Sequence, residues 1–255
     1  NRTGDPRYYK GTRRAEDYIR RGAPRLDDGT IIHQTGNSIW LDTAYMTAPF
    51  MSRLALIQKD EDMLDDAARQ IIQIAKHTED PDTELSYHMW DPETGHSPEL
   101  WARGNGWVVM AAVEVLEVMP RDHGMYDQLV DLLQDRCEAL AALQDDFGLW
   151  HTVLDEPETY LEVSASAMYA FVFQRAILRG WLPPEYSDNA VRALRGIGEY
   201  IGPGGRVAGV SAGTSPGDKR YYNTVKKGEY PWGTGATLLA LCERIVYLDM
   251  LSQSR

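Results

Sequence analysis

Apolar residues recur at helical spacing along most of this 255-residue chain. Leu64, Ala68, Ile71 and Ala75 share one face of a helix that is expected to begin near Asp60. The same spacing predicts helices in the leucine-rich segment after residue 123 and at residues 12–21, 42–58, 105–118, 162–179, 187–200 and 233–250. Strand-like alternation is rare, and its best short stretch, 205–210, is expected to form half of a hairpin.

Four of the expected helices open in the same way, with an aromatic residue followed by small residues. The aromatic residues are Trp40, Trp101, Tyr160 and Trp232. Each such opening recurs after a second helix with a more charged face, which suits an inner and an outer ring of helices. We therefore predict an all-α fold, an (α/α)6 toroid or barrel in one domain over residues 1–255, with an irregular helical bundle as the alternative. The aromatic-rich loops before the small-residue helices then form a cleft at one end.

Charge and composition narrow the range of partners. The formal net charge of −12 argues against nucleic acid, because phosphate binding needs clustered Lys and Arg, and it opposes binding to an anionic membrane surface. The chain has no run of about 18 apolar residues that would span a membrane and no apolar signal-peptide core at its N-terminus, so we expect a cytoplasmic monomer or homodimer. Cys137 and Cys242 lie in apolar helical patterns and are expected to be buried free thiols.

The densest group of chemically active residues lies in the segment LSYHMWDPETGHSPELWARGNGW, residues 85–107. It contains His88, Asp91, Trp101, Arg103 and Trp107. Indole faces cover the apolar C–H faces of a sugar ring, and a positioned acid can protonate a sugar. We therefore predict a carbohydrate site with Asp91 as general acid, kept protonated by the desolvating indoles of Trp90 and Trp101. The alternative, which is compatible with this role, is that Asp91 opens a type I turn in Asp-Pro-Glu-Thr-Gly.

Other candidate site residues lie in loops or at helix starts. Asp42 follows Trp40 and opens a helix, where it could hold a substrate hydroxyl or a water molecule, or serve only as an acid favoured by the helix dipole. His33, His88 and His151 each lie beside an aromatic residue or a helix start and are candidate substrate contacts. The sequence has no His-Glu-x-x-His motif and no cysteine-rich cluster, so we expect no metal and no other cofactor.

An acidic sugar would need a local cation against the acidic background of the chain. Arg103 could form a two-point contact with a substrate carboxylate, or an ion pair with a loop acid such as Glu99. Arg206 and Lys219 are the other candidate cations. Ser211 lies in a Gly-x-Ser-x-Gly pattern, but the chain lacks the alternating strands that a nucleophile elbow requires, so a serine hydrolase is not expected.

Four ordered motifs carry a family resemblance. The segments WLDTAYMTAPF, YHMWDPETGHSPELWARGNGW, GLWHTVLDEPETYLEVSASAMYA and PWGTGATLLAL resemble glycoside hydrolase family 105, the unsaturated rhamnogalacturonyl hydrolases, and more distantly family 88, the unsaturated glucuronyl hydrolases. The resemblance implies an (α/α)6 barrel with a central catalytic cleft, and a small acidic oligosaccharide as substrate. It also implies that a 4,5-unsaturated uronic acid at the non-reducing end is protonated at C4 and hydrated at C5, after which the hemiketal rearranges and releases the next sugar.

The resemblance also implies roles for individual residues. Asp91 matches the general acid and Asp42 the second acid of the family. The residues that match substrate-contacting positions are His88, Trp101, Arg103, Trp107 and His151, and His33 and Trp232 join them as expected substrate contacts.

The chain departs from the family pattern in two ways. The Tyr-His-x-Trp-Asp and Asp-Pro-Glu-Thr-Gly segments, which an insertion often separates in relatives, are fused here, so Asp91 aligns with either aspartate. The chain also begins late, and we expect a truncated N-terminus without the first helix of the family. Two rival interpretations remain: another α/α-toroid sugar enzyme, such as a polysaccharide lyase or an epimerase, and a non-catalytic carbohydrate-binding protein.

Overall fold

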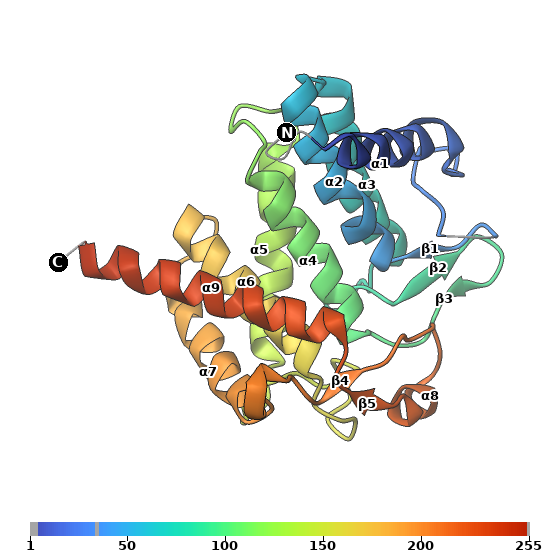
Figure 1. Ribbon diagram of the computed structural model, residues 1–255. Coiled ribbons are helices and arrows are strands. Elements are labelled where there is room, and N and C mark those ends of the chain that lie inside the picture. The colour runs from blue at the N-terminus through green and yellow to red at the C-terminus, as the bar shows by residue number, and fades with distance from the viewer. Residues whose placement is uncertain (1–4, 34–35, 254–255) are drawn as a thin grey trace.

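Helices dominate the computed structural model, which describes residues 5–33 and 36–253 (Figure 1). The α-helices are α1 (Pro6–Asp17), α2 (Asp42–Gln58), α3 (Glu61–Thr78), α4 (Ala102–Leu116), α5 (Tyr126–Ala142), α6 (Val163–Arg179), α7 (Ser187–Gly198), α8 (Lys219–Thr224) and α9 (Pro231–Gln253). Short helical turns occur at Tyr18–Gly22, Pro184–Tyr186 and Pro203–Gly205. Most of the helices predicted from apolar spacing are confirmed to within a few residues, whereas α8 was not predicted.

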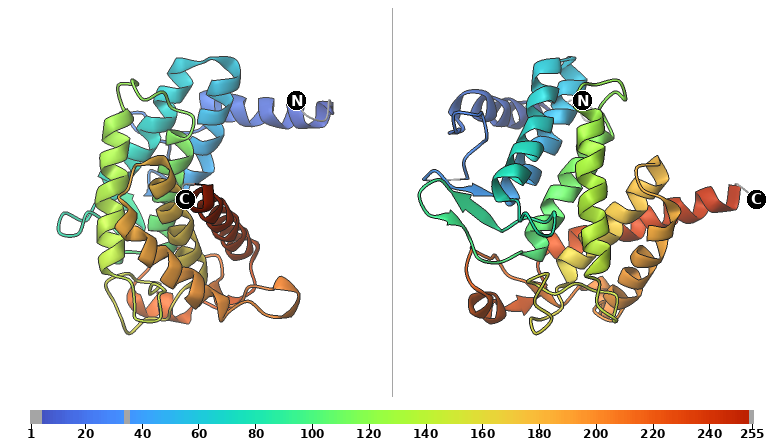
Figure 2. Two further views of the ribbon diagram at one scale, coloured as in Figure 1. Left: turned by 90° about the vertical axis from the view of Figure 1, so that its left-hand side faces the viewer. Right: turned by 180° about the vertical axis from the view of Figure 1, so that it is seen from behind.

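The helices alternate between two layers, as the repeat predicted. Helices α2, α4, α6 and α9 pack against one another in succession, and α3, α5 and α7 each pack behind the inner helix that precedes them. Figure 2 shows α3 and α5 on the face of the molecule opposite to α9. This alternation is that of an α/α toroid and not of an irregular bundle. The grouping of the whole chain into one domain remains a prediction.

Two small sheets lie at the end of the helices where α4 and α9 begin (Figure 1). Strands β1 (Ile39–Trp40), β2 (Met89–Asp91) and β3 (Gly95–His96) form one antiparallel sheet. Strands β4 (Val210–Ser211) and β5 (Lys227–Gly228) form the other. The strand expected at residues 205–210 overlaps β4 only at Val210, and since α8 lies between β4 and β5 the pair is not a hairpin. Because β1 leads directly into α2, its pairing with β2 brings the start of that helix next to the segment around residue 88.

Glycines at the helix starts allow the inner helices to approach closely. A Cβ on Gly104 would lie 2.8 Å from Leu41 and Trp101, and one on Gly106 would lie 2.7 Å from the sulfur of Met168. Atoms of real side chains do not approach this closely, so both positions need glycine or a shift of their neighbours. The small residues in the repeated motif are thus explained by packing.

Two further expectations can be compared with the structure. Both cysteines are free, but only Cys137 is buried; Cys242 is exposed on α9, so the prediction of a buried thiol is wrong there. Several apolar side chains of α9 are likewise exposed, and this helix has no polar outer face. In the described part of the chain, no helix is long and apolar enough to cross a membrane.

Candidate active site

A carboxylate and an imidazole meet where β1 passes into α2. The backbone N–H of Leu41 donates a hydrogen bond to the carbonyl of His88, which holds the two segments together. Oδ2 of Asp42 then lies 3.5 Å from Nε2 of the fully buried His88, and 25% of the Asp42 side chain is exposed. Both of these atoms are buried, and neither has a closer polar partner among the described residues. Asp42 therefore has one oxygen turned toward His88, while the exposed part of its side chain faces outward.

The other ring nitrogen of His88 fixes the protonation of this pair. Nδ1 lies 2.7 Å from the hydroxyl of Tyr222, which comes from α8. Burial raises the pKa of Tyr222, so its hydroxyl stays protonated, and because the carboxylate of Asp42 beside Nε2 can only accept, the hydroxyl donates to Nδ1. Burial lowers the pKa of His88, so the ring is neutral and its proton lies on Nε2, toward Asp42. Burial has the largest single effect on the pKa of Asp42 and would raise it, but the combined effects of His88, His33 and Arg103 keep this pKa below its ordinary value.

Aromatic rings enclose the Asp42–His88 pair. His88 stacks on Trp101 with ring centroids 3.9 Å apart, and Trp40 meets His88 edge to face at 5.4 Å. His33 stacks on Trp40 at 4.4 Å, and its Nδ1 lies 3.0 Å from the hydroxyl of Thr43. Predicted contact residues His33, His88 and Trp101 thus gather around Asp42, in the kind of aromatic setting that a sugar ring requires.

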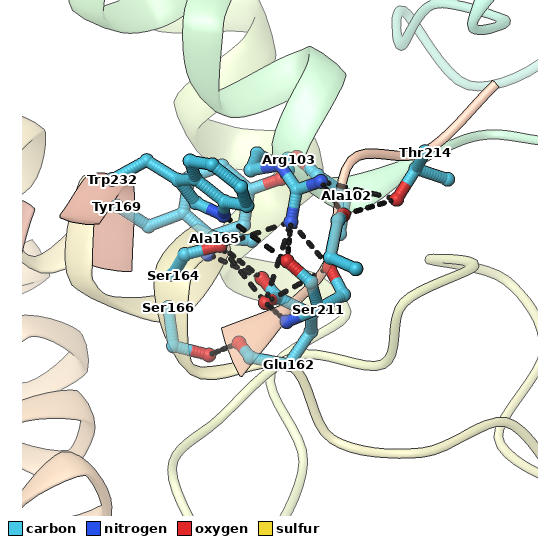
Figure 3. A network of polar contacts seen from close by, with 11 residues as sticks. Ala102, Arg103, Glu162, Ser164, Ala165, Ser166, Tyr169, Ser211, Thr214 and Trp232 are labelled. Carbon is cyan, nitrogen blue, oxygen red and sulfur yellow. Dashed lines mark hydrogen bonds and ion pairs between the residues drawn. The ribbon is translucent and has the colours of Figure 1, made fainter. Parts of the chain in front are cut away.

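Arg103 is part of a buried polar network (Figure 3). Its two terminal nitrogens donate to the hydroxyl and carbonyl of Ser211, to the carbonyl of Ala212 at 2.8 Å and to the hydroxyl of Thr214 at 3.0 Å. Glu162 is fully buried and lies 3.6 Å from the guanidinium. Both terminal nitrogens are therefore occupied by the protein, and the predicted two-point contact with a substrate carboxylate is wrong for this structure.

The ion-pair alternative for Arg103 is correct in kind but not in partner. The predicted acid Glu99 instead accepts a hydrogen bond from the backbone N–H of Lys219. Glu162 is held in place because it caps α6, accepting from the backbone N–H of Ala165 at 2.7 Å, and because it also accepts from the N–H of Ser211 at 2.8 Å.

Tryptophans connect this network to the Asp42–His88 pair. The guanidinium carbon of Arg103 lies 4.7 Å from the ring of Trp101 and 5.7 Å from that of Trp232. The indole N–H of Trp232 donates to the carbonyl of Ser211 at 3.0 Å. Trp107 stacks on Tyr45 at 4.9 Å. Trp107, Trp232 and Tyr45 line an apolar cavity of about 460 Å³ between the inner helices. The predicted contact residues Trp107 and Trp232 therefore share one concave surface.

Asp91 lies in the β2–β3 hairpin. Its Oδ1 accepts hydrogen bonds from the backbone N–H groups of Glu93 at 2.9 Å and Thr94 at 3.1 Å, which is the turn interpretation of Asp-Pro-Glu-Thr-Gly. The indoles expected to desolvate it are engaged elsewhere, since Trp90 stacks on His77 at 4.6 Å and Trp101 stacks on His88. Among the described contacts, none joins Asp91 to Asp42 or to Trp101, so the predicted setting of a general acid is not present around Asp91.

His151 also lies apart from the Asp42–His88 pair. Its Nδ1 lies 2.5 Å from the carbonyl oxygen of Thr159, and its Nε2 lies 3.4 Å from a carboxylate oxygen of Asp145. Both ring nitrogens serve the loop between α5 and α6, so the structure gives His151 a role in the loop and does not support its prediction as a substrate contact.

The two remaining candidate cations form ion pairs at the surface. Nε of Arg206 lies 2.8 Å from Glu229, and Nζ of Lys219 lies 2.8 Å from Glu156. Within the ranges that the structure describes, no group of three or more His, Cys, Asp or Glu is arranged to hold a metal ion.

Several functional neighbours were missed by sequence reasoning. Tyr222, Glu162 and Thr214 carry no periodic signal, and Ser211 was considered only as a nucleophile. The one available signal was Glu162 directly before the small-residue segment Val-Ser-Ala-Ser-Ala, where an acid is favoured at a helix start.

Comparisons with known proteins converge on one group of enzymes. The family model described as Glycosyl Hydrolase Family 88 matches residues 1–248. The unsaturated rhamnogalacturonyl hydrolase YesR of Bacillus subtilis is 32% identical over 94% of this chain, which spans 72% of that protein. An unsaturated 3S-rhamnoglycuronyl hydrolase of an Alteromonas species is 26% identical over 82% of the chain, which spans about half (51%) of its length. A solved family 105 glycoside hydrolase of C. acetobutylicum superposes with a TM-score of 0.89 at 31% identity, covering 95% of this chain and 75% of that one.

Proposed function

The chain belongs to glycoside hydrolase family 105, within the group that the Family 88 model describes, and from this premise we propose that it releases a 4,5-unsaturated uronic acid from the non-reducing end of an oligosaccharide. The names of the two relatives support a substrate of this class. One observation carries the proposal: an accessible carboxylate, Asp42, is paired with a buried neutral imidazole between aromatic rings.

The proposed reaction is a hydration followed by collapse. A proton adds to C4 of the C4=C5 double bond, the oxygen of a water molecule bonds to C5, and the proton that this water loses goes to a carboxylate. The hemiketal at C5 then opens and the bond to the next sugar breaks. We assign the carboxylate that accepts the proton of the water to Asp42, because its lowered pKa keeps it ionised at neutral pH.

The proton that adds to C4 needs a second acidic group as its donor. The family resemblance assigns it to Asp91, whose Oδ1 is held by the turn while Oδ2 has no recorded partner in the described part of the chain. The turn position of Asp91 at the same time favours a second candidate function, in which the aromatic site binds sugars without turning them over.

Loss of ultraviolet absorbance from unsaturated disaccharides tests both functions. Asp91→Asn keeps an oxygen that can accept from the turn N–H groups, but the amide cannot donate an acidic proton. A loss of turnover in this variant therefore reports on proton donation and not on the loss of the turn. Glu93→Gln, on the same exposed turn, is the matched control. We expect Asp42→Asn and Asp91→Asn each to lower turnover by roughly 10²- to 10⁴-fold, with Glu93→Gln unchanged. Full activity of Asp91→Asn would remove Asp91 from the mechanism, and binding without any loss of absorbance in the parent protein would favour the binding function.

We also propose Lys227 as the cation that meets the substrate carboxylate. Lys227 is exposed on β5 directly opposite Ser211 of β4, and its Nζ lies 4.5 Å from the ring of Tyr160. Among the residues that the structure describes, no carboxylate is recorded within ion-pair distance of it. Its charge is therefore available beside the Arg103 network, where the guanidinium itself is occupied.

Replacing Lys227 tests this assignment. One charged hydrogen bond at a partly exposed site is worth about 1.5 kcal/mol, so Lys227→Met should raise KM roughly tenfold and leave kcat nearly unchanged. Lys226→Met is the matched control, because it removes the same charge from the neighbouring exposed position. Equal kinetic effects of the two substitutions would point to the overall charge of the surface and against a specific contact.

A further inference from the structure

Tyr222 joins a distant part of the chain to the Asp42–His88 pair. It lies on α8, is fully buried, and its hydroxyl oxygen is 2.7 Å from Nδ1 of His88, a residue 134 positions earlier. The ring of Tyr222 also lies beside His88 and Trp101, with centroid separations of 6.2 Å and 6.5 Å. A tyrosine in this position touches the imidazole and not the exposed part of Asp42.

Tyr222 and Asp42 together favour the tautomer of His88 in which Nε2 carries the proton. A neutral imidazole has one N–H donor and one acceptor. Because the hydroxyl of Tyr222 donates to Nδ1, the ring proton lies on Nε2, 3.5 Å from Oδ2 of Asp42. If Nδ1 carried the proton instead, the hydroxyl of Tyr222 would accept it, but the carboxylate of Asp42 would then face the lone pair of Nε2.

We propose that Tyr222 is a positioning residue, which by donating to Nδ1 stabilises the Nε2–H tautomer of His88 and through it the ionised state of Asp42. The proposal rests on the role given above to Asp42 as the proton acceptor, but its first consequence, the tautomer, does not depend on any substrate. It gives α8 a role in the chemistry that its distance in sequence conceals.

Several charged or titratable groups face the pair from the elements packed around it. Asp42 comes from α2, Arg103 from α4 and His33 from the loop before β1, and Glu99 acts on Tyr222 from the loop before α4. None of these supplies a hydrogen bond to Nδ1 of His88, whose recorded partner in the described chain is the Tyr222 hydroxyl. Removing this hydroxyl therefore changes one hydrogen bond while the neighbouring charges remain.

Tyr222→Phe is the test, with Tyr221→Phe as its matched control. Tyr221 lies on the same helix, and its hydroxyl accepts a hydrogen bond from the backbone N–H of Ser215 rather than contacting His88. In the parent protein the ring ¹⁵N shifts of His88, assigned with His88→Gln, should show a neutral Nε2–H tautomer at neutral pH. In Tyr222→Phe we expect a mixture of tautomers, an acidic limb of kcat/KM moved to higher pH, and a loss of kcat/KM of roughly two- to tenfold, which is the fold-change that one hydrogen bond corresponds to. Tyr221→Phe should leave all three unchanged.

Three results would overturn the proposal. A charged or Nδ1–H His88 in the parent protein would do so without any variant, which keeps the test valid if Tyr222→Phe fails to fold. An unchanged tautomer in Tyr222→Phe, or equal shifts in Tyr221→Phe, would assign Tyr222 to packing alone. Absence of turnover on every unsaturated uronide would instead count against the proposed function and leave the tautomer result standing.

Discussion

Replacing Glu162 by Gln should destabilise this protein more than any comparable change at its surface. Each oxygen of the carboxylate already accepts a backbone N–H, Oε1 from Ser211 at 2.8 Å and Oε2 from Ala165 at 2.7 Å. Whichever oxygen becomes an NH₂ group therefore faces another donor. The buried guanidinium of Arg103 also loses the negative charge that lies 3.6 Å away. Breaking a buried pair in this way costs about 3–5 kcal/mol, a large part of the stability of a typical domain.

Urea denaturation followed by circular dichroism measures this loss. For a chain of this size, the cost corresponds to a melting temperature lower by roughly 10 °C. Glu158→Gln, the same change at an exposed position of the same loop, should have almost no effect. Combining Glu162→Gln with Arg103→Met should cost less than the sum of the two single changes, by about 1–3 kcal/mol. A free energy of unfolding for Glu162→Gln within about 1 kcal/mol of the Glu158→Gln value would refute the buried-pair argument.

Three further outcomes follow from the structure. Gly106→Ala should lower the unfolding free energy by about 1–3 kcal/mol, because the new Cβ meets Met168, and an unchanged urea midpoint would contradict this. A thiol reagent should label exposed Cys242 in the native protein but reach Cys137 only after unfolding, since Cys137 is buried and its pKa is raised by burial; mass spectrometry before and after urea decides this. Because the pKa of Asp42 is lowered and its ionised form is the active one, kcat/KM should show no loss from Asp42 protonation until the pH falls below the ordinary aspartate value of 3.8.

The helical framework could be predicted because its signal is local. Apolar spacing predicted a helix over residues 42–58, which are the observed bounds of α2. Asp60 and Glu162 are acids at the starts of α3 and α6, where their side chains cap the first turn. The aromatic and small-residue motif also predicted the inner layer correctly, because Gly104 and Gly106 are needed for close packing.

The candidate site was predictable only in part. His33, His88, Trp101 and Asp42 come together because β1 pairs with β2, although α2 and α3 separate these two strands in the sequence. The direction of the Arg103 side chain depended on carbonyl groups more than a hundred residues away, which no local pattern reveals.

Asp91 illustrates a second limit of sequence reasoning. The motif Asp-Pro-Glu-Thr-Gly specifies a turn, and a turn needs the same carboxylate oxygen that would otherwise be free for chemistry. The spacing of residues gave both interpretations, but only the observed partners of Trp90 and Trp101 show which side chains surround Asp91.

The segment between the helical turn Pro203–Gly205 and α9 supplies Ser211, Thr214 and Tyr222, which contact Arg103 and His88 more than a hundred residues earlier. Contacts of such separation carry a large loop-closure cost and form late. A refolding chain should therefore recover its helical content before its catalytic competence. The residues of the site that come earlier in the chain are therefore fully positioned only after residues 206–230 have packed against them.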